Sequence, residues 1–207
     1  TDGLGREVAL DLARKGWTIL AHGRNAERGA ALQGELQALG ATSRFYRADF
    51  SNLAEVAAMA DDLLAHEARL EVLLNNAGVM ITERAESRDG HELAFQVNYL
   101  APYLLTQRLL PLLERSAPAR IVNVASAGQA PIDFSDVMLT RGWDRMQSYS
   151  QSKLAQIMMS FDMAPALATR GVDVNALHPG TFMPTKMVIG RFEPRTPEGV
   201  HVNAVYG

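Results

Sequence analysis

The sequence predicts a single α/β domain over residues 1–207, built on a doubly wound parallel sheet. Two observations support this fold class. Helical and strand patterns alternate along the chain without a break in composition or a long Pro/Gly/Ser linker. In addition, polar residues that could carry chemistry follow directly after predicted strands, which is where ligands bind in open parallel sheets.

The first two elements are a helix and a buried strand. Val8 and Leu12 lie one helical turn apart and predict a helix over Gly5–Lys15, which Gly16 ends. The apolar run that follows predicts a strand at Trp17–Ala21.

The middle of the chain repeats this alternation. A helical pattern covers Ala26–Leu39 and stops at Gly40, and Ser43–Ala48 is the next predicted strand. A helix over Leu53–His66 then leads into a short apolar strand at Val72–Asn75.

Four further elements complete the pattern. A long helix is predicted over Glu92–Glu114, and a strongly β-like segment over Arg120–Ala125. The next helix covers Tyr149–Ala168, where Pro165 weakens the last turn. Val172–Leu177 is the last predicted strand.

The segment from Tyr149 to Lys153 indicates proton transfer. Residues four apart on a helix share a face, with Cβ atoms about 6 Å apart, so Lys153 can lie beside Tyr149. A free phenol has a pKa of about 10, and a positive charge at roughly 5 Å lowers that pKa by about two units. Tyr149 would then be the general acid/base, and Ser126 would hold the reacting oxygen by a hydrogen bond. The alternative is a surface tyrosine beside a solvated lysine.

The opening residues look like the end of a glycine-rich phosphate loop. Gly3, Leu4 and Gly5 precede a helix, where glycines let the backbone approach a pyrophosphate and the helix start offers free N–H groups. The first glycine of such a loop would lie upstream of Thr1. A plain glycine turn before a helix is the alternative.

Together these residues resemble the short-chain dehydrogenase/reductase family over nearly the whole chain. Residues 130–136 and 152–155 look like the branch that includes retinol dehydrogenase-like and protochlorophyllide reductase-like enzymes. The resemblance implies a Rossmann-type NAD(P)-binding domain that interconverts a carbonyl and an alcohol by hydride transfer. The matching motifs, in the family's order, are Asp2-Gly3-Leu4-Gly5, Asn75-Asn76-Ala77-Gly78, Asn98, Ser126, Tyr149 with Lys153, and Pro179-Gly180.

The resemblance implies a catalytic set of Asn98, Ser126, Tyr149 and Lys153. Tyr149 would be the acid/base, Ser126 would stabilise the substrate oxygen, and Lys153 would bind the ribose and lower the pKa of the tyrosine. Asn98 would hold a water and a helix distortion for proton relay. The alternative for Asn98 is an amide on a helix surface.

The resemblance also places cofactor-binding residues on loops after the strands. Asn76, followed by Ala77 and Gly78, would bring its loop to the adenosine ribose, or serve as a turn former, or both. Asp49 would contact the adenine, or residues 49–52 would only cap the next helix.

The loop after the last strand would contact the nicotinamide end of the cofactor. Pro179 and Gly180 match the family, but the threonine that follows departs by one position. Thr181 and Thr185 are therefore both candidates for contact with the nicotinamide amide or the pyrophosphate. His178 is interpreted as structural because no second ligand occurs at metal-binding spacing, so no metal is predicted.

Arg24 favours NADP over NAD as the cofactor. Enzymes that use NAD normally carry an acidic residue at this position, which accepts hydrogen bonds from the ribose hydroxyls. A guanidinium instead suits a 2′-phosphate, because it offers planar charge-assisted hydrogen bonds. Asp2 argues for NAD, since many phosphate-using relatives place a basic residue there.

Composition excludes several classes of function. The chain is 47% hydrophobic and 21% charged, which is typical of globular domains. A net charge of −3 with scattered basic residues gives no footprint for nucleic acid or an anionic membrane. The lack of cysteine excludes thiolate metal sites and fits a reducing compartment, so we expect a cytoplasmic protein unless a targeting segment precedes Thr1. No apolar run reaches the roughly 20 residues of a membrane span.

We expect an apolar or aromatic carbonyl substrate and a homodimer or homotetramer. Two rival functions stay open: a sugar-nucleotide epimerase or dehydratase, which needs a larger carboxyl-terminal domain, and a non-catalytic NADP-binding regulator. The substrate wall would come from residues 129–147 and from Met183, Met187, Val188, Ile189 and Phe192.

A further strand is expected upstream of the glycine loop, between Trp17–Ala21 and Val72–Asn75. Without it, both strands would have unpaired edges, so residues 1–207 alone are predicted to be unstable. The last helix and strand of the family would likewise follow Gly207.

Overall fold

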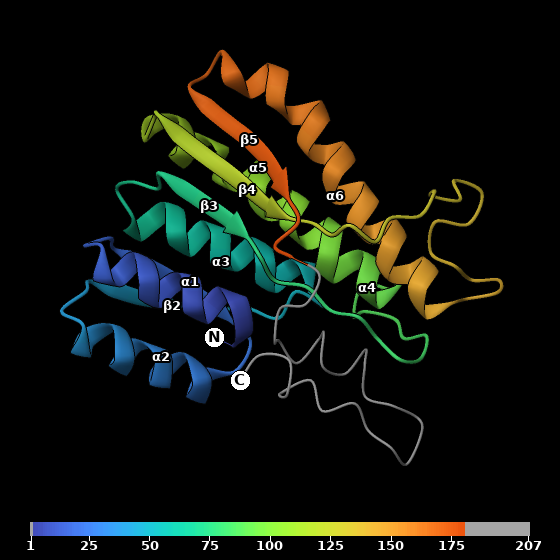
Figure 1. The fold of residues 1–207 in the computed structure, drawn as a ribbon, viewed down its shortest axis with the longest axis horizontal. Helices are drawn as coiled ribbons and strands as arrows, with labels where there is room; N and C mark the ends of the chain where they lie inside the picture. Colours follow the sequence, from blue (N-terminus) through green and yellow to red (C-terminus); the bar gives the residue numbers. More distant parts are fainter. Residues whose placement is uncertain (1, 181–207) are drawn as a thin grey trace.

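The computed structural model describes residues 2–180, which form parallel strands covered by helices (Figure 1). The predicted α/β class and the order of the elements are confirmed. The strands are β1 (Ile19–Gly23), β2 (Ser43–Arg47), β3 (Val72–Asn75), β4 (Ala119–Val124) and β5 (Val172–Leu177). The helices are α1 (Gly3–Arg14), α2 (Ala26–Ala38), α3 (Leu53–His66), α4 (Leu93–Phe95), the π-helix η1 (Gln96–Leu100), α5 (Ala101–Arg115) and α6 (Arg145–Ala168).

The strands fall into two groups, and all pairs are parallel. β1 pairs with β2, with Ile19 opposite Ser43. β1 begins at Ile19 rather than at Trp17 as predicted, and the side chain of Trp17 is 44% exposed instead of lying in a buried strand. The second group has the order β3-β4-β5, with Asn75 opposite Asn123. Within residues 2–180 no strand joins β1 to β3, and the further strand expected between them stays a prediction.

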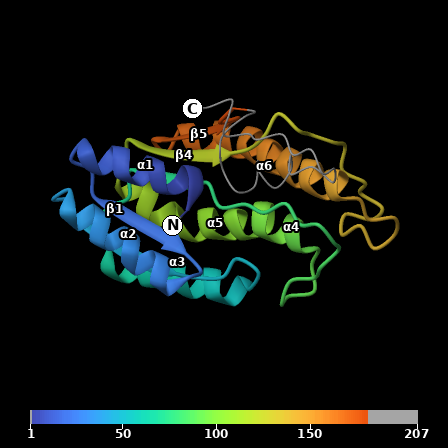
Figure 2. The ribbon, with the colours of Figure 1, turned by 60° about the horizontal axis from the view of Figure 1, so that its bottom comes forward.

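Two apolar clusters hold the helices against the strands. The larger cluster, with Leu109, Leu113 and Ile121 fully buried, joins α3, α5 and α6 to the strands. The smaller cluster, which includes Leu10 and Leu36, joins α1 and α2 to β1. In Figure 1, α1 lies in front of the strands and α5 behind them, and Figure 2 shows α3 and α5 side by side. Burial of these apolar surfaces is what places both helix layers.

Polar side chains set the starts of four helices. Asp2, Asn25, Asn52 and Asp144 each accept a hydrogen bond from a backbone N–H in the first turn. The Asp144 cap starts α6 before Tyr149, which had been predicted as the first helical residue, so Tyr149 lies inside the helix. α1 likewise begins earlier than predicted.

The long helix predicted over Glu92–Glu114 is interrupted by a π-helix. One short α-helical turn is followed by η1, and α-helical geometry resumes at Ala101. Such π-turns are rare and occur frequently at functional sites. Asn98 lies at the centre of η1, so the helix distortion that the family resemblance implied is present at that residue.

Candidate active site

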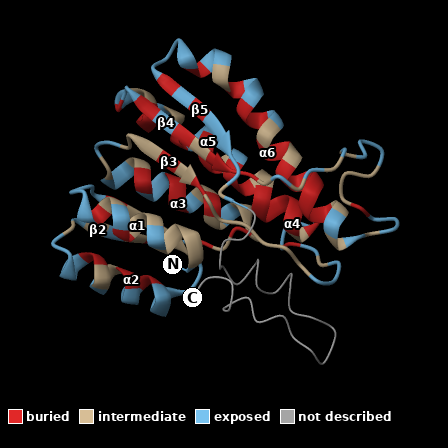
Figure 3. Ribbon diagram, viewed as in Figure 1, coloured by how far each residue is buried: buried red, intermediate tan, exposed pale blue. Residues whose placement is uncertain are grey.

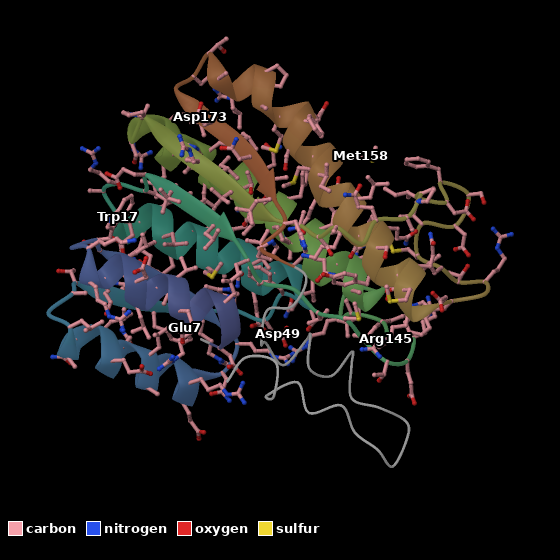
Figure 4. All side chains as sticks on the ribbon, in the orientation of Figure 1. Glu7, Trp17, Asp49, Arg145, Met158 and Asp173 are labelled. Carbon is pink, nitrogen blue, oxygen red and sulfur yellow. The ribbon has the colours of Figure 1, made fainter. Side chains whose placement is uncertain are left out.

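A cavity of about 730 Å³ lies at the carboxyl ends of the strands, between the start of α1 and the middle of α6. It extends into the space between β1 and β3, so its volume includes more than a ligand site. Asp49 lies at the edge of the sheet towards which the strands point (Figure 4). The predicted site residues that line the cavity are Gly3, Leu4, Gly5, Arg24, Asp49, Asn76, Ala77, Gly78, Ser126, Tyr149, Lys153, Pro179 and Gly180.

Some sequence-based candidates lie outside the described residues. Thr181 and Thr185 are among them, and so is the apolar segment from Met183 to Phe192. Their predicted contacts with cofactor and substrate stay predictions.

The glycine loop meets the loop after β3. A Cβ atom added to Gly5 would lie 2.7 Å from the Nδ2 atom of Asn76, so with any other residue at position 5 the Asn76 side chain would have to shift. Gly3 has a φ of +56°, a left-handed conformation that glycine adopts readily. The start of α1 and the β3 loop therefore form two sides of one crevice.

Tyr149 and Lys153 share a face of α6, as their spacing predicts. The Nζ atom of Lys153 lies 5.9 Å from the centre of the Tyr149 ring. Both side chains are buried, with 8% and 3% of their surfaces exposed. The alternative of a solvated surface pair is therefore wrong, and both residues line the cavity instead.

Lys153 is held by two acceptors beneath the cavity. Its Nζ atom donates to the carbonyl oxygen of Val124 at 2.9 Å and to Oε1 of Gln156 at 2.8 Å. An ammonium has three protons, so one donor is left for a ligand. Burial disfavours the charged form and lowers the pKa of Lys153 to about 8.

Gly78 allows the β3 loop to approach this group closely. A Cβ atom at Gly78 would lie 3.4 Å from the Nζ atom of Lys153 and 3.3 Å from Oδ1 of Asn98. Three predicted site residues, from the loop after β3, from η1 and from α6, therefore meet at one point.

Asn98 is fully buried and ties two segments together. Its Oδ1 atom accepts from the N–H of Val79 at 2.7 Å, and its Nδ2 atom donates to the carbonyl of Val79 at 2.9 Å. Nδ2 also donates to the hydroxyl of Ser152 at 2.9 Å. The alternative of an amide on a helix surface is excluded by this burial.

Ser126 follows β4 and lines the cavity. Its hydroxyl oxygen accepts from the N–H of Gly128 at 3.1 Å, which leaves the hydroxyl proton for donation. His178 accepts from the N–H of Ala127 at 3.2 Å, in agreement with its structural interpretation. Across residues 2–180 no cluster of three or more His, Asp or Glu side chains could hold a metal ion.

Arg24 and Asp49 lie at the other end of the cavity. Burial opposes ionisation of Asp49, but hydrogen bonds from Ser51 and the charges of Arg24 and Arg88 outweigh it and lower the pKa of this carboxyl. Asp49 bonds the turn at Ser51, whereas Asn52 caps α3. The cap expected from residues 49–52 is therefore present at Asn52 rather than at Asp49, and contact of Asp49 with adenine stays a prediction.

Three side chains near the site were missed from the sequence, one of them half-buried and two fully buried. His22 lines the cavity and stacks on Phe50 at 4.2 Å, and burial lowers its pKa despite a hydrogen bond to Ala48. Gln156 bonds Lys153, and Glu92 bonds the start of α6. The only sequence signal was an unusual run of polar residues on α6, which Figure 3 shows as buried.

The fold and the strand-end cavity define a nucleotide-binding α/β protein of the Rossmann type. The family model described as short chain dehydrogenase matches residues 1–196, and the chain belongs to that family.

The chain is similar in sequence to retinol dehydrogenases. It is 36% identical over 183 residues to retinol dehydrogenase 11 of Mus musculus, which covers 86% of this chain and 58% of that protein. It is 37% identical over 185 residues to retinol dehydrogenase 13 of Homo sapiens, with 86% and 55% covered. The chain thus spans somewhat more than half the length of these relatives. The predicted retinol dehydrogenase-like branch is confirmed.

Solved structures of the family show the same fold. The Pseudomonas aeruginosa RhlG/NADP active-site complex has a TM-score of 0.77 and 30% identity, covering 99% of this chain and 77% of that one. A metagenomic short-chain oxidoreductase in complex with NADP has a TM-score of 0.72 and 27% identity, covering 86% of this chain and 77% of that one.

None of the helices in residues 2–180 has the length and apolar character needed to cross a bilayer.

Proposed function

We propose that this protein interconverts a carbonyl and an alcohol with NADP as the hydride carrier. The observation that carries the proposal is the placement of Tyr149, Lys153 and Ser126 around one cavity, with Lys153 buried at 3% exposure. Burying an ammonium costs free energy unless it is hydrogen-bonded, and buried ionisable groups in clefts are typical of active sites.

The residues present fit a dinucleotide. Gly5 and Gly78 leave space beside the cavity where a Cβ atom would crowd the side chains of Asn76 and Asn98, respectively. Leu4 and Gly5, in the first turn of α1, line the cavity, and the backbone N–H groups at a helix start would favour an anionic pyrophosphate there. The free proton of the Lys153 ammonium is available for a ribose hydroxyl.

In the reductive direction the protein supplies position and a proton. When bound, NADPH supplies the hydride that adds to the carbonyl carbon. Ser126 donates a hydrogen bond to the carbonyl oxygen, and Tyr149 gives its hydroxyl proton to the same oxygen as the alcohol forms. The positive charge of Lys153 stabilises the resulting phenolate, and Asn98 holds the β3 loop against α6.

Arg24 supports NADP rather than NAD. Its guanidinium lines the adenosine end of the cavity and is exposed, so a 2′-phosphate can reach it. Both solved relatives described above were determined with NADP.

The substrate that we propose is an apolar carbonyl compound or its alcohol. The names of the curated relatives, which are retinol dehydrogenases, support a long apolar alcohol or aldehyde. A substrate panel that includes small polar ketones tests this, because a preference for those ketones would contradict the proposal.

The decisive experiment compares turnover with cofactor binding. NADPH oxidation should occur with apolar aldehydes and should fall at least about 10²-fold in Tyr149→Phe, because general acid catalysis contributes that much. NADPH binding, followed by nucleotide fluorescence, should survive the substitution. Binding without turnover in the unsubstituted protein would favour the rival regulator.

The proposal also covers how the protein assembles and where it lies in the cell. Met158, which Figure 4 shows on the outside of α6, is 46% exposed. Phe161 on the same helix is 77% exposed and Tyr103 on α5 is 41% exposed, and these exposed apolar side chains support a homodimer or homotetramer built on the two helices. Light scattering of the protein with Phe161→Asp tests the assembly. We also propose a cytoplasmic location, which cell fractionation tests.

A further inference from the structure

Glu92 is a fully buried carboxylate that the proposed chemistry does not use. It immediately precedes α4, and none of its side chain is exposed to solvent. An isolated buried charge is strongly unfavourable, so a carboxylate in this position must be satisfied by donors.

Three donors from three segments meet the two oxygens of Glu92. The backbone N–H of Phe95 donates to Oε2 at 2.7 Å. The indole N–H of Trp143 donates to Oε1 at 3.2 Å, and the hydroxyl of Ser148 donates to the same atom at 3.0 Å. Both oxygens therefore act as acceptors.

These contacts join the helix of Asn98 to the helix of Tyr149. Trp143 belongs to the segment between Ser126 and Tyr149, and Ser148 is the residue directly before Tyr149. Ser148 is also buried, with 1% of its surface exposed. A single side chain thus connects the start of α4 with the first turn of α6.

We propose that Glu92 is a positioning residue for the proposed carbonyl chemistry, which holds Trp143, near the end of the substrate segment at residues 129–147, and the first turn of α6 against the start of α4. The inference rests on the proposed function, because the segment after Ser126 is taken as the substrate wall.

A second contact holds the same segment further along. The guanidinium of Arg84 donates to the carbonyl oxygen of Leu139 at 3.1 Å. Leu139 has a φ of +47°, a conformation that is uncommon for residues other than glycine and that needs support from its surroundings. Residues 84–92 therefore hold the segment at two points, and loss of the Glu92 contact should loosen only the part near Trp143.

Glutamine is the informative substitution at this position. Its NH₂ group would face either the N–H of Phe95 or the indole N–H of Trp143, and neither donor can become an acceptor. Glu92→Gln therefore keeps the size of the side chain and must lose at least one of these contacts. Glu83→Gln is a matched control, because Glu83 lies in the same part of the chain and is exposed.

The test uses the full-length protein labelled with 5-fluorotryptophan. The fluorine NMR signal of Trp143 is assigned by its loss in Trp143→Phe. In Glu92→Gln this signal should shift and broaden, and the KM for the carbonyl substrate should rise about tenfold, since hydrogen bonds to charged groups are typically worth that factor or more. The KM for NADPH should stay within about twofold, because the cofactor contacts are separate.

Two further comparisons separate positioning from general loss of structure. Trp143→Phe alone should also raise the carbonyl KM, and Glu92→Gln added to it should raise the KM by less than in the unsubstituted background. If Glu92→Gln does not fold, the KM for the carbonyl substrate is measured in Trp143→Phe and in Ser148→Ala, and a rise in both supports the positioning role.

The inference is overturned if Glu92→Gln behaves like Glu83→Gln in both the Trp143 signal and the carbonyl KM. It is also overturned if the KM values for substrate and NADPH rise equally. If the unsubstituted protein does not reduce any carbonyl compound, the proposed function fails, and the positioning role in that reaction fails with it. A shifted Trp143 signal would then show a tether that is only structural.

Discussion

The ammonium of Lys153 donates a 2.8 Å hydrogen bond to Oε1 of Gln156, one turn further along α6. Both side chains are buried, and the Nε2 atom of Gln156 has no partner within the described residues. The amide oxygen of Gln156 therefore orients the ammonium of Lys153, whereas the amide nitrogen makes no hydrogen bond within residues 2–180. This pair lies beneath the point where Gly78, Asn98 and Lys153 meet.

Gln156→Leu should weaken cofactor binding. The substitution removes one of the two acceptors of Lys153, leaving only the carbonyl of Val124. We expect the KM for NADPH to rise about tenfold, because a hydrogen bond to a charged group is lost. Gln37→Leu on the exposed side of α2 is the matched control and should leave the KM unchanged. Equal KM values in the two variants would show that Gln156 does not position the lysine.

The stability of the protein without cofactor should rise with pH as Lys153 loses its proton. The pKa of Lys153 is about 8 in the folded protein, against 10.5 for an ordinary lysine. Between these values the unfolded chain binds a proton that the folded protein has released, so the free energy of unfolding increases with pH. A shift of this size corresponds to about 3 kcal/mol across the window.

Lys153→Met isolates this contribution, because other titrating groups cancel in the comparison. Urea unfolding at pH 7.5 and at pH 10.5 should show the difference between the unsubstituted protein and Lys153→Met changing by about 3 kcal/mol in favour of the lysine. A difference that is independent of pH would mean that the folded lysine keeps its ordinary pKa.

Gly78→Ala should lower activity, whereas the control substitution Gly34→Ala should not. The added methyl group at Gly78 would lie 3.3 Å from Oδ1 of Asn98, a tight contact with a side chain that its bonds to Val79 hold in place, and 3.4 Å from Nζ of Lys153, an ordinary contact. We expect a fall in kcat/KM of at least about tenfold, since small displacements of catalytic groups are costly.

Gly34→Ala provides the control for that experiment. Gly34 lies inside α2, and nothing would lie within 4 Å of an added Cβ atom. Alanine should therefore stabilise the protein by about 0.5–1 kcal/mol without changing turnover. Loss of activity in both variants would point to a general effect on folding.

Arg24→Asp should shift cofactor preference from NADPH to NADH. The acidic side chain repels a 2′-phosphate and can accept from ribose hydroxyls. The ratio of kcat/KM for NADPH to that for NADH should fall about 10²-fold. Arg14→Ala at the end of α1 is the control. An unchanged ratio would show that the 2′-phosphate is bound elsewhere.

Local sequence patterns were sufficient for the elements and for much of the site. The period of apolar residues is a property of neighbours in the chain, so it predicted β3 and β5 with the bounds that the structure has. The spacing of Tyr149 and Lys153 placed them on one face of a helix for the same reason. Polar residues after the strands were brought to one edge because all the strands are parallel.

Only the tertiary structure decided which polar side chains are buried and what they bond. The bond from Lys153 to the carbonyl of Val124, the bond from Asn98 to Ser152 and the bonds to Glu92 from Trp143 and Ser148 join segments that are distant in the chain. No local pattern encodes such contacts, because a buried polar group is stabilised only when partners from other elements arrive with the right geometry. The sequence by itself therefore determined the class of fold and the chemical groups at the strand ends, whereas packing decided how those groups are held.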